Sequence, residues 1–179
     1  MSYLQAIVLG TVQGLSEFLP ISSSAHLVLI PRLFGWPDQG LLFDVFMHAG
    51  SLLALCFYFR KDLVLLLRAW LPHRPAETAL RQQGSMMILA TIPVLIAGLL
   101  FNDAIGTIFR DISWIGVWFI IVATLLLITE FRIRKRKSNP LSALTAKNAL
   151  IIGLAQAAAL LPGVSRSGMT IWTGSLLWS

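Results

Sequence analysis

The stretch Gln13-Gly-Leu-Ser-Glu-Phe-Leu-Pro-Ile-Ser-Ser-Ser-Ala-His26 decides how the chain is built, because it puts polar groups inside hydrophobic sequence. An apolar run at residues 3–12 precedes it, and more apolar sequence follows it. Pro20 disfavours a continuous helix, because proline lacks a backbone N–H. Ionisable residues inside a membrane are costly and usually line a polar cavity. We therefore expect a broken helix here, with an acid, hydroxyls and an imidazole that serve a binding site.

The composition indicates an all-α polytopic membrane protein. Of the 179 residues, 56% are hydrophobic and 12% are charged, which is about half the charged fraction of a soluble domain. Three apolar runs are expected to cross a bilayer as helices, at residues 41–59, 86–101 and 114–131. The run at 86–101 is near the short limit and contains Pro93, so we expect flanking residues to extend it. The run at 63–71 is shorter and carries Arg68, which predicts an interfacial or partly buried helix. The net charge of +6 does not indicate a nucleic-acid partner, because basic patches studded with aromatic residues are absent.

The basic residues predict how the chain is oriented in the membrane. They form one cluster after the first span and another after the third: Arg60, Lys61, Arg68, Arg74 and Arg81, then Arg132, Arg134, Lys135, Arg136, Lys137 and Lys147. The connection at residues 102–113 has only Arg110, against Asp103 and Asp111. Because positive charge stays on the cytoplasmic side, we expect both clusters there and residues 102–113 outside. This orientation puts the serine-rich segments in or near the outer half of the bilayer of a multi-pass cell-membrane protein.

A faint internal repeat appears when the sequence is shifted by 143 positions. Gly10-Thr-Val-Gln13 then lies over Gly153-Leu-Ala-Gln156, and Ser22–Ala25 lies over Ser165–Gly168. We expect one membrane domain over residues 1–179, with a first repeat plus connection at 1–145 and the start of an incomplete second repeat at 146–179. Inverted repeats in membrane proteins place broken helices at their interface. The N-termini of such half-helices bind anions such as phosphate.

The polar residues of the first motif have both structural and functional interpretations. Gln13 and Glu17 are four residues apart and share a helix face, which suits either a helix–helix hydrogen bond or a cavity. His26 follows Ser23 by three residues and could share its face. His48 has the same four-residue spacing from Asp44, and this pair suits a supporting role near a site or a plain structural role.

The second motif, Pro162-Gly-Val-Ser-Arg-Ser-Gly168, carries Arg166 far from the basic clusters. A charge at the centre of a membrane helix costs about 2.5–3.5 kcal/mol, and snorkelling to an interface is one way to avoid that cost. However, Gly163 and Gly168 allow the backbone to approach a ligand closely, and arginine binds phosphate in a bidentate way. We therefore favour a phosphate site for a phosphorylated lipid.

These motifs resemble those of the undecaprenyl-diphosphatase family, the bacterial membrane phosphatases associated with bacitracin resistance. The resemblance lies in residues 13–26 and 162–170, and the stretches at 43–55 and 90–101 also resemble the family's sequences. It implies hydrolysis of undecaprenyl diphosphate to undecaprenyl phosphate, which recycles the lipid carrier for peptidoglycan. It also implies an inner-membrane protein whose active site faces the periplasm or exterior. Ala25 stands where the family commonly has glycine, and the family's second repeat continues well past Ser179.

The resemblance assigns roles only at matching positions. Gln13 and Glu17 match an acid motif of the family, Ser23 and His26 match its Ser-Ser-x-x-His motif, and the segment around Arg166 matches its second motif. As a hypothesis, Ser23 attacks the terminal phosphorus and His26 acts as base and later acid, although His26 as the nucleophile stays open. Glu17 either holds a divalent cation, Mg²⁺ or Ca²⁺, or orients His26. The expected substrate-binding residues are Gln13, Ser22, Ser24, Gly163, Ser165, Ser167, Gly168 and Thr170, with Arg166 as the phosphate clamp.

Other classes of protein compete with this interpretation. A transporter or flippase for a phosphorylated lipid or an anion would use the same broken helices, and an inactive fragment of the phosphatase is a further alternative. A second class of lipid phosphatase requires a histidine after a Ser-Arg motif, and no histidine follows Arg166. A purely structural subunit leaves Glu17 and Arg166 unexplained. The expected partners are the polyprenyl diphosphate lipid and the membrane, with a homo-oligomer as an open possibility.

Overall fold

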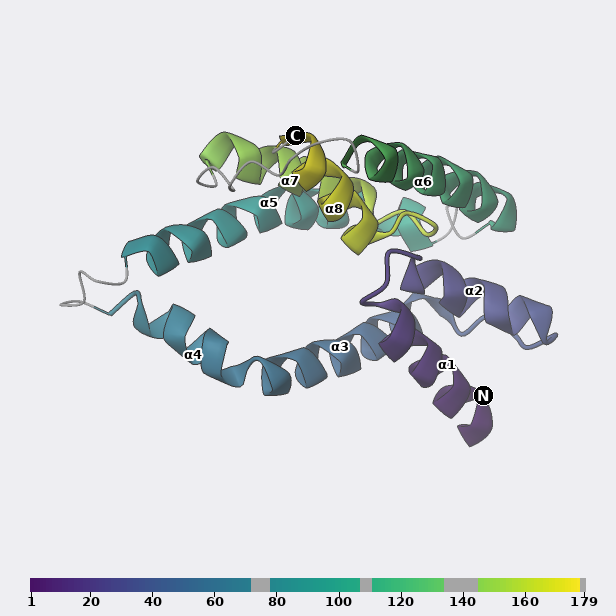
Figure 1. Ribbon diagram of the computed structural model, residues 1–179. Coiled ribbons are helices and arrows are strands. Elements are labelled where there is room, and N and C mark those ends of the chain that lie inside the picture. Colours follow the sequence, from purple (N-terminus) through teal and green to yellow (C-terminus); the bar gives the residue numbers. More distant parts are fainter. Residues whose placement is uncertain (72–77, 107–110, 134–144, 178–179) are drawn as a thin grey trace.

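The computed structural model describes residues 1–71, 78–106, 111–133 and 145–177, and every regular element in these ranges is a helix (Figure 1). The predicted all-α membrane fold is confirmed. The helices follow one another as α1 (Tyr3–Ser16), α2 (Ser23–Leu33), α3 (Gly40–Tyr58), α4 (Arg60–Arg68), α5 (Thr78–Gly106), α6 (Ile112–Ile133), α7 (Ala146–Ala158) and α8 (Arg166–Leu177).

Within the described ranges, three helices are long and apolar enough to cross a membrane, and they match the three predicted spans. They cover Gly40–Tyr58, Thr78–Phe101 and Ile112–Phe131. The second is extended at its N-terminal end well beyond the predicted run at 86–101, and Pro93 lies inside the helix. Their side chains are mostly exposed, as with Leu99 and Leu53. Since large apolar surfaces are rare on soluble proteins, lipid is the medium that these faces require.

The short helix α4 begins three residues earlier than the predicted run at 63–71 and ends at Arg68. None of its residues is buried, and it carries Arg60, Lys61 and Arg68 beside exposed leucines. This composition is consistent with an interfacial helix. The sidedness of the chain stays a prediction, and Arg74 and residues 134–137 of the basic clusters lie outside the described residues.

Two broken helices bring the serine-rich segments together. The first is α1, the segment at 17–22 and α2, and the second is α7, the segment at 159–165 and α8. In Figure 1 the two connecting segments face each other near the middle of the molecule. Both predicted breaks are therefore present. The division into repeats at residue 145 stays a prediction.

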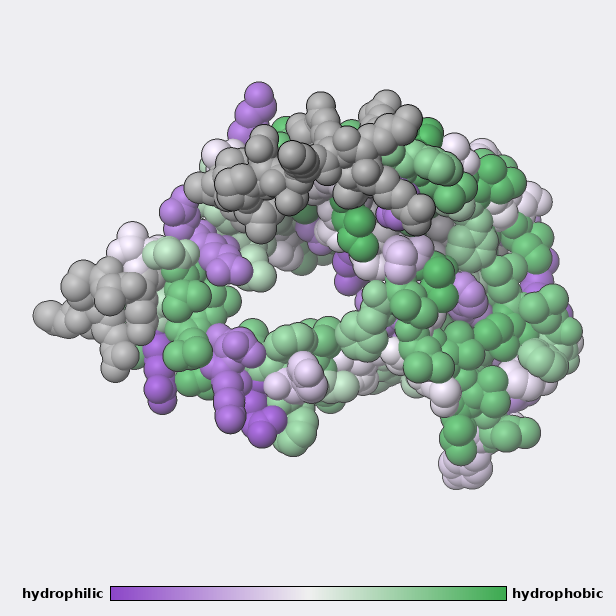
Figure 2. Space-filling model, viewed as in Figure 1, coloured by the Kyte–Doolittle hydropathy of each residue, from purple (hydrophilic) through white to green (hydrophobic). Residues whose placement is uncertain are grey.

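Helix α6 packs against both broken helices and thereby fixes their positions. One buried cluster joins Val122 of α6 to Met169 of α8, and another joins Ile115 of α6 to Ala25 and Val28 of α2. Helices α5 and α7 also pack closely at Gly153, where a Cβ atom would lie 2.5 Å from the carbonyl oxygen of Ala90. On the other side, the end of α4 meets the start of α5, where Arg81 Nε donates to the carbonyl oxygen of Ala69 at 2.9 Å. Figure 2 shows an opening between α3 and α5 beyond this contact.

Candidate active site

The two serine-rich segments are tied to each other by reciprocal hydrogen bonds. The backbone N–H of Gly163 donates to Ser22 Oγ at 3.2 Å, and Ser167 Oγ donates to the carbonyl oxygen of Leu19 at 3.1 Å. Ser22 has a left-handed backbone with φ of 60°, which turns its hydroxyl toward the other segment. More than 140 residues of sequence separate the partners, so these bonds place the two motifs side by side.

The serines that precede α2 and α8 have different roles. Ser165 caps α8, because its Oγ accepts from the backbone N–H of Gly168 at 3.1 Å. Ser22 stands at the corresponding position before α2, but it makes no side-chain cap because its hydroxyl is bonded to Gly163. Ser24 and Ser167 lie within 3.3 Å and 3.1 Å of the hydroxyls of Ser22 and Ser165, respectively.

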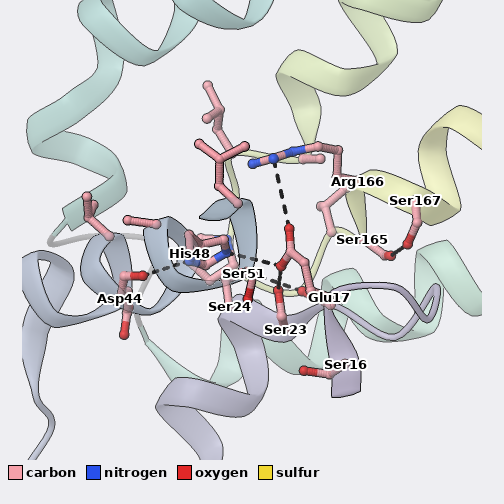
Figure 3. Close-up of a pocket in the computed structure, with 18 of the residues that line it drawn as sticks. Ser16, Glu17, Ser23, Ser24, Asp44, His48, Ser51, Ser165, Arg166 and Ser167 are labelled. Carbon is pink, nitrogen blue, oxygen red and sulfur yellow. Dashed lines mark hydrogen bonds and ion pairs between the residues drawn. The ribbon is translucent and has the colours of Figure 1, made fainter. Parts of the chain in front are cut away.

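Glu17 is the centre of the polar cluster (Figure 3). Its Oε2 accepts a hydrogen bond from Ser23 Oγ at 2.5 Å and another from Gln13 Nε2 at 2.9 Å. His48 Nε2 lies 3.3 Å from the same oxygen, and Arg166 Nη1 lies 4.0 Å from Oε1. The side chain of Glu17 is 18% exposed, whereas that of Arg166 is 52% exposed. The carboxylate is therefore held from several sides, while the guanidinium stays accessible.

This cluster lines a cavity of about 520 Å³. Its polar wall comes from the two serine-rich segments, and α3 contributes an additional wall that includes Asp44 and His48. Four of the predicted substrate-binding residues line the cavity: Ser22, Ser24, Ser165 and Ser167. A cavity of this size, with converging polar groups and an accessible cation, suits an anionic headgroup.

The other predicted binding residues lie elsewhere. Gln13 is buried and bonded to Glu17, and the Thr170 hydroxyl bonds to carbonyl oxygens of its own helix. A Cβ atom on Gly163 would lie 2.8 Å from the carbonyl oxygen of Ile115, and one on Gly168 would lie 3.1 Å from Ser165 Cβ. The missing side chain of Gly163 lets α6 approach closely, and that of Gly168 lets Ser165 approach closely. We had expected both glycines to let a ligand approach the backbone.

His26 does not accompany Ser23 and Glu17. Its Nδ1 is 2.8 Å from the carbonyl oxygen of Ser22, and its ring makes an edge contact with Phe119. It lines a second, mainly apolar cavity of about 740 Å³ bounded by α6 and α8. The three-residue spacing from Ser23 suggested a shared face, but Ser23 reaches back toward Glu17 while the imidazole packs on α6. The structure thus brings Glu17, Ser23 and Arg166 together and leaves His26 on the other side of the serine-rich segments.

His48 takes the place beside Glu17 that we expected for His26. The sequence signal was the four-residue spacing from Asp44, and it left a supporting role and a structural role equally open. In the structure His48 Nδ1 donates to the backbone carbonyl of Asp44 at 2.7 Å. Its contact with Glu17 and its place in the cavity wall put His48 in the site, and no sequence pattern specifies either.

The predicted divalent cation does not fit the groups around Glu17. Oε2 already accepts two hydrogen bonds, and the next neighbours are an imidazole and a guanidinium. Mg²⁺ and Ca²⁺ require several oxygen ligands, and a guanidinium repels them. Across the described ranges, no group of three or more His, Cys, Asp or Glu side chains is arranged to hold a metal ion.

The fold and the site define a polytopic membrane protein with a polar cavity where two broken helices meet. Residues 6–178 match the family described as bacitracin resistance protein BacA. The undecaprenyl-diphosphatase of Chlorobium chlorochromatii is 46% identical over 186 aligned residues, which cover 99% of this chain and 66% of that protein. The undecaprenyl-diphosphatase of Idiomarina loihiensis is also 46% identical, over 99% of this chain and 67% of its own length.

The chain belongs to the BacA family, and the expected resemblance is confirmed. It spans about two thirds of the length of these curated relatives.

Proposed function

We propose that the protein hydrolyses undecaprenyl diphosphate to undecaprenyl phosphate and inorganic phosphate. The supporting observation is the cluster of Ser23, Glu17 and Arg166, which forms where the two serine-rich segments meet. It combines a hydroxyl, a base within hydrogen-bonding distance and an accessible cation, which are the parts that phosphoryl transfer needs. Family membership supports the choice of the lipid diphosphate as substrate.

Ser23 is the nucleophile that the hydrogen bonds support best. The hydroxyls of Ser22, Ser165 and Ser167 are used to tie the two segments or to cap α8, and that of Ser24 lies against Ser22. Ser23 Oγ instead donates to a carboxylate. A serine hydroxyl needs an adjacent base to become reactive, and here the carboxylate stands where we expected the imidazole of His26.

In the first step, Ser23 Oγ forms a bond to the terminal phosphorus, and its proton passes to Glu17 Oε2. The bond from that phosphorus to the bridging oxygen breaks, and undecaprenyl phosphate leaves with the electron pair. Glu17 then releases its proton to water. In the second step, a water molecule attacks the phosphoserine, the serine–phosphorus bond breaks, and a proton from the water returns to Ser23 Oγ. This step regenerates the Ser23 hydroxyl and releases inorganic phosphate.

Arg166 and the start of α8 supply the electrostatic part of the proposal. Arg166 is the first residue of α8, and it lines the cavity together with Ser165 and Ser167, so its guanidinium and the start of that helix adjoin the same space. Helix N-termini attract anions, and a guanidinium matches the geometry of phosphate oxygens. Together they would neutralise the charge that develops on the phosphoryl oxygens.

The location of the site follows from the same proposal. The enzyme would lie in the inner membrane with its cavity toward the periplasm or exterior, as the positive-inside rule suggests. A divalent cation, Mg²⁺ or Ca²⁺, would reach the cavity bound to the diphosphate oxygens, and a homo-oligomer is compatible with this arrangement.

The test is phosphate release from undecaprenyl diphosphate by the purified chain in proteoliposomes. We expect release by the wild type, and a loss of about 100-fold or more in Ser23→Ala and Glu17→Gln. Arg166→Lys keeps the charge but not the planar fork and should be intermediate. Transfer of the lipid between leaflets without phosphate release would support the flippase alternative and refute the hydrolase.

The nucleophile is tested separately by trapping the phosphorylated intermediate. Acid quenching during turnover, followed by mass spectrometry of peptides, should locate phosphate on Ser23. Phosphate on His26 would refute the serine assignment while leaving the reaction itself intact.

A further inference from the structure

The imidazole of His48 lies against Glu17 although neither serine-rich motif contains it. Its Nε2 is 3.3 Å from Glu17 Oε2, and its Nδ1 is 2.7 Å from the carbonyl oxygen of Asp44. Carbonyl and carboxylate oxygens both accept hydrogen bonds, so Nδ1 and Nε2 both donate in this contact, and the bond from Nδ1 fixes the orientation of the ring. Nε2 is therefore the ring atom presented to the carboxylate (Figure 3).

The contact of His48 with Glu17 Oε2 comes from a different helix than the other two contacts on that oxygen. Gln13 and Ser23 also bond Oε2, but they belong to the same broken helix as Glu17 and move with it. His48 belongs to α3, a separate membrane-spanning helix. Of these three contacts, only the one with His48 ties the carboxylate to an independent element. The position of Oε2 relative to the rest of the cavity thus depends on α3.

We propose that His48 is a positioning residue that holds Glu17 Oε2 toward Ser23. This inference rests on the proposed function, because it gives His48 a part in that reaction. The residue acts through Glu17, since its Nε2 is directed at the carboxylate and its Nδ1 at the backbone. It would therefore affect the turnover of bound substrate more than the binding of substrate.

Two substitutions separate positioning from packing. His48→Gln places an amide nitrogen near the position of Nε2 and keeps a donor for Glu17, whereas His48→Leu fills the space without a donor. A displacement of a catalytic group by about 1 Å can cost about 100-fold. We expect His48→Leu to lower kcat by about 10- to 100-fold with little change in KM, and His48→Gln to stay within about threefold of the wild type.

Leu53→Ala is the matched control on α3. Leu53 is 71% exposed on the same helix, and its substitution should leave kcat and KM unchanged. Wild-type turnover in His48→Leu would overturn the proposal. Equal losses in His48→Gln and His48→Leu would also overturn it, because they would indicate that ring packing, and not the donor, matters.

A second readout does not depend on phosphate release. In the chain labelled with ¹⁵N-histidine, the Nε2 resonance of His48, assigned by its loss in His48→Gln, should shift when Glu17 is replaced in Glu17→Gln. An unchanged resonance would refute the contact. If the wild-type chain releases no phosphate, the proposed function fails, and this shift still supports or refutes the placement of His48 on Glu17.

Discussion

Replacing Gly163 by alanine should destabilise the junction between α6 and the second serine-rich segment. Gly163 has φ of +101°, and an added Cβ atom would lie 2.8 Å from the carbonyl oxygen of Ile115 and 2.9 Å from Trp118 Cβ. Both neighbours belong to α6, and Ile115 is fully buried. The new methyl group therefore meets a backbone atom and a Cβ atom, neither of which moves easily.

The expected magnitude has two parts. A non-glycine residue at such a positive φ costs about 1–3 kcal/mol, and overpacking a tight contact costs about 1–3 kcal/mol. The sum is about 2–6 kcal/mol of unfolding free energy. For a chain of this size, each kcal/mol lowers Tm by about 2–4 °C, so the expected decrease is about 4–24 °C.

Thermal denaturation in detergent micelles, followed by tryptophan fluorescence, measures this decrease. The chain has six tryptophans, and one of them, Trp118, lies beside Gly163. Gly116→Ala is the matched control, because Gly116 lies on α6, the helix that Gly163 contacts, and an added Cβ atom there meets nothing within 4 Å. A Tm for Gly163→Ala equal to that of Gly116→Ala would refute the close approach of α6 to this segment.

Three other predictions concern the hydrogen bond between the two serine-rich segments, the pKa of Asp111 and the binding of divalent cations at Glu17. Ser22→Ala removes the acceptor of the Gly163 N–H, and leaving that buried donor unsatisfied should lower the unfolding free energy by about 1–3 kcal/mol. Ser22→Asn keeps a side-chain oxygen and tolerates the left-handed backbone of this position, so it should lose less in the same assay. Hydrogen bonds from Ser113 hold the pKa of Asp111 below its usual range. Its stabilising contribution is therefore present above about pH 4 and is lost as the pH falls through the lowered pKa, so Tm measured from pH 3 to 7 should fall less at the acid end in Asp111→Asn than in the wild type. Calorimetry without diphosphate should detect no Ca²⁺ or Mg²⁺ binding that Glu17→Gln abolishes, because the neighbours of Glu17 are hydrogen-bond donors; a site lost in that variant would contradict this account.

The membrane spans could be predicted because length and apolar composition alone determine them. The helices at residues 41–59 and 114–131 could be predicted without tertiary information. A continuous apolar run of about 20 residues is stable only as a helix in lipid. The breaks before α2 and α8 were also predictable, because a proline and a run of serines end one helix and start another. The start of α4 was less predictable, because helix ends vary with local caps.

The site was only partly predictable, because motifs specify which residues meet but not how they are rotated. Glu17, Ser23 and Arg166 lie within two motifs, and their cluster follows once the segments converge. The place of His26 depends on Ser22, whose left-handed backbone sets the direction in which α2 starts. His48 depends on the packing of α3 against α1, a tertiary contact for which the sequence contains no pattern. The role of Ser22 as the acceptor for the Gly163 N–H, in place of a cap, was hidden for the same reason.

The separation between Arg166 and Glu17 explains how opposite charges can serve the same site. Each would cost about 2.5–3.5 kcal/mol if placed alone at the centre of a membrane, so docking of the two segments offsets both costs at once. A tight ion pair would do this more fully, but it would also occupy the guanidinium. At 4.0 Å the pair lies beyond hydrogen-bonding distance, and Arg166 stays half exposed while Ser23, Gln13 and His48 surround the other carboxylate oxygen. Glu17 is thus stabilised mainly by Ser23, Gln13 and His48, which leaves the arginine for the phosphate. Arg166→Gln should accordingly lower turnover far more than Tm, and a loss of stability as large as that of Gly163→Ala would show that the arginine serves the fold instead.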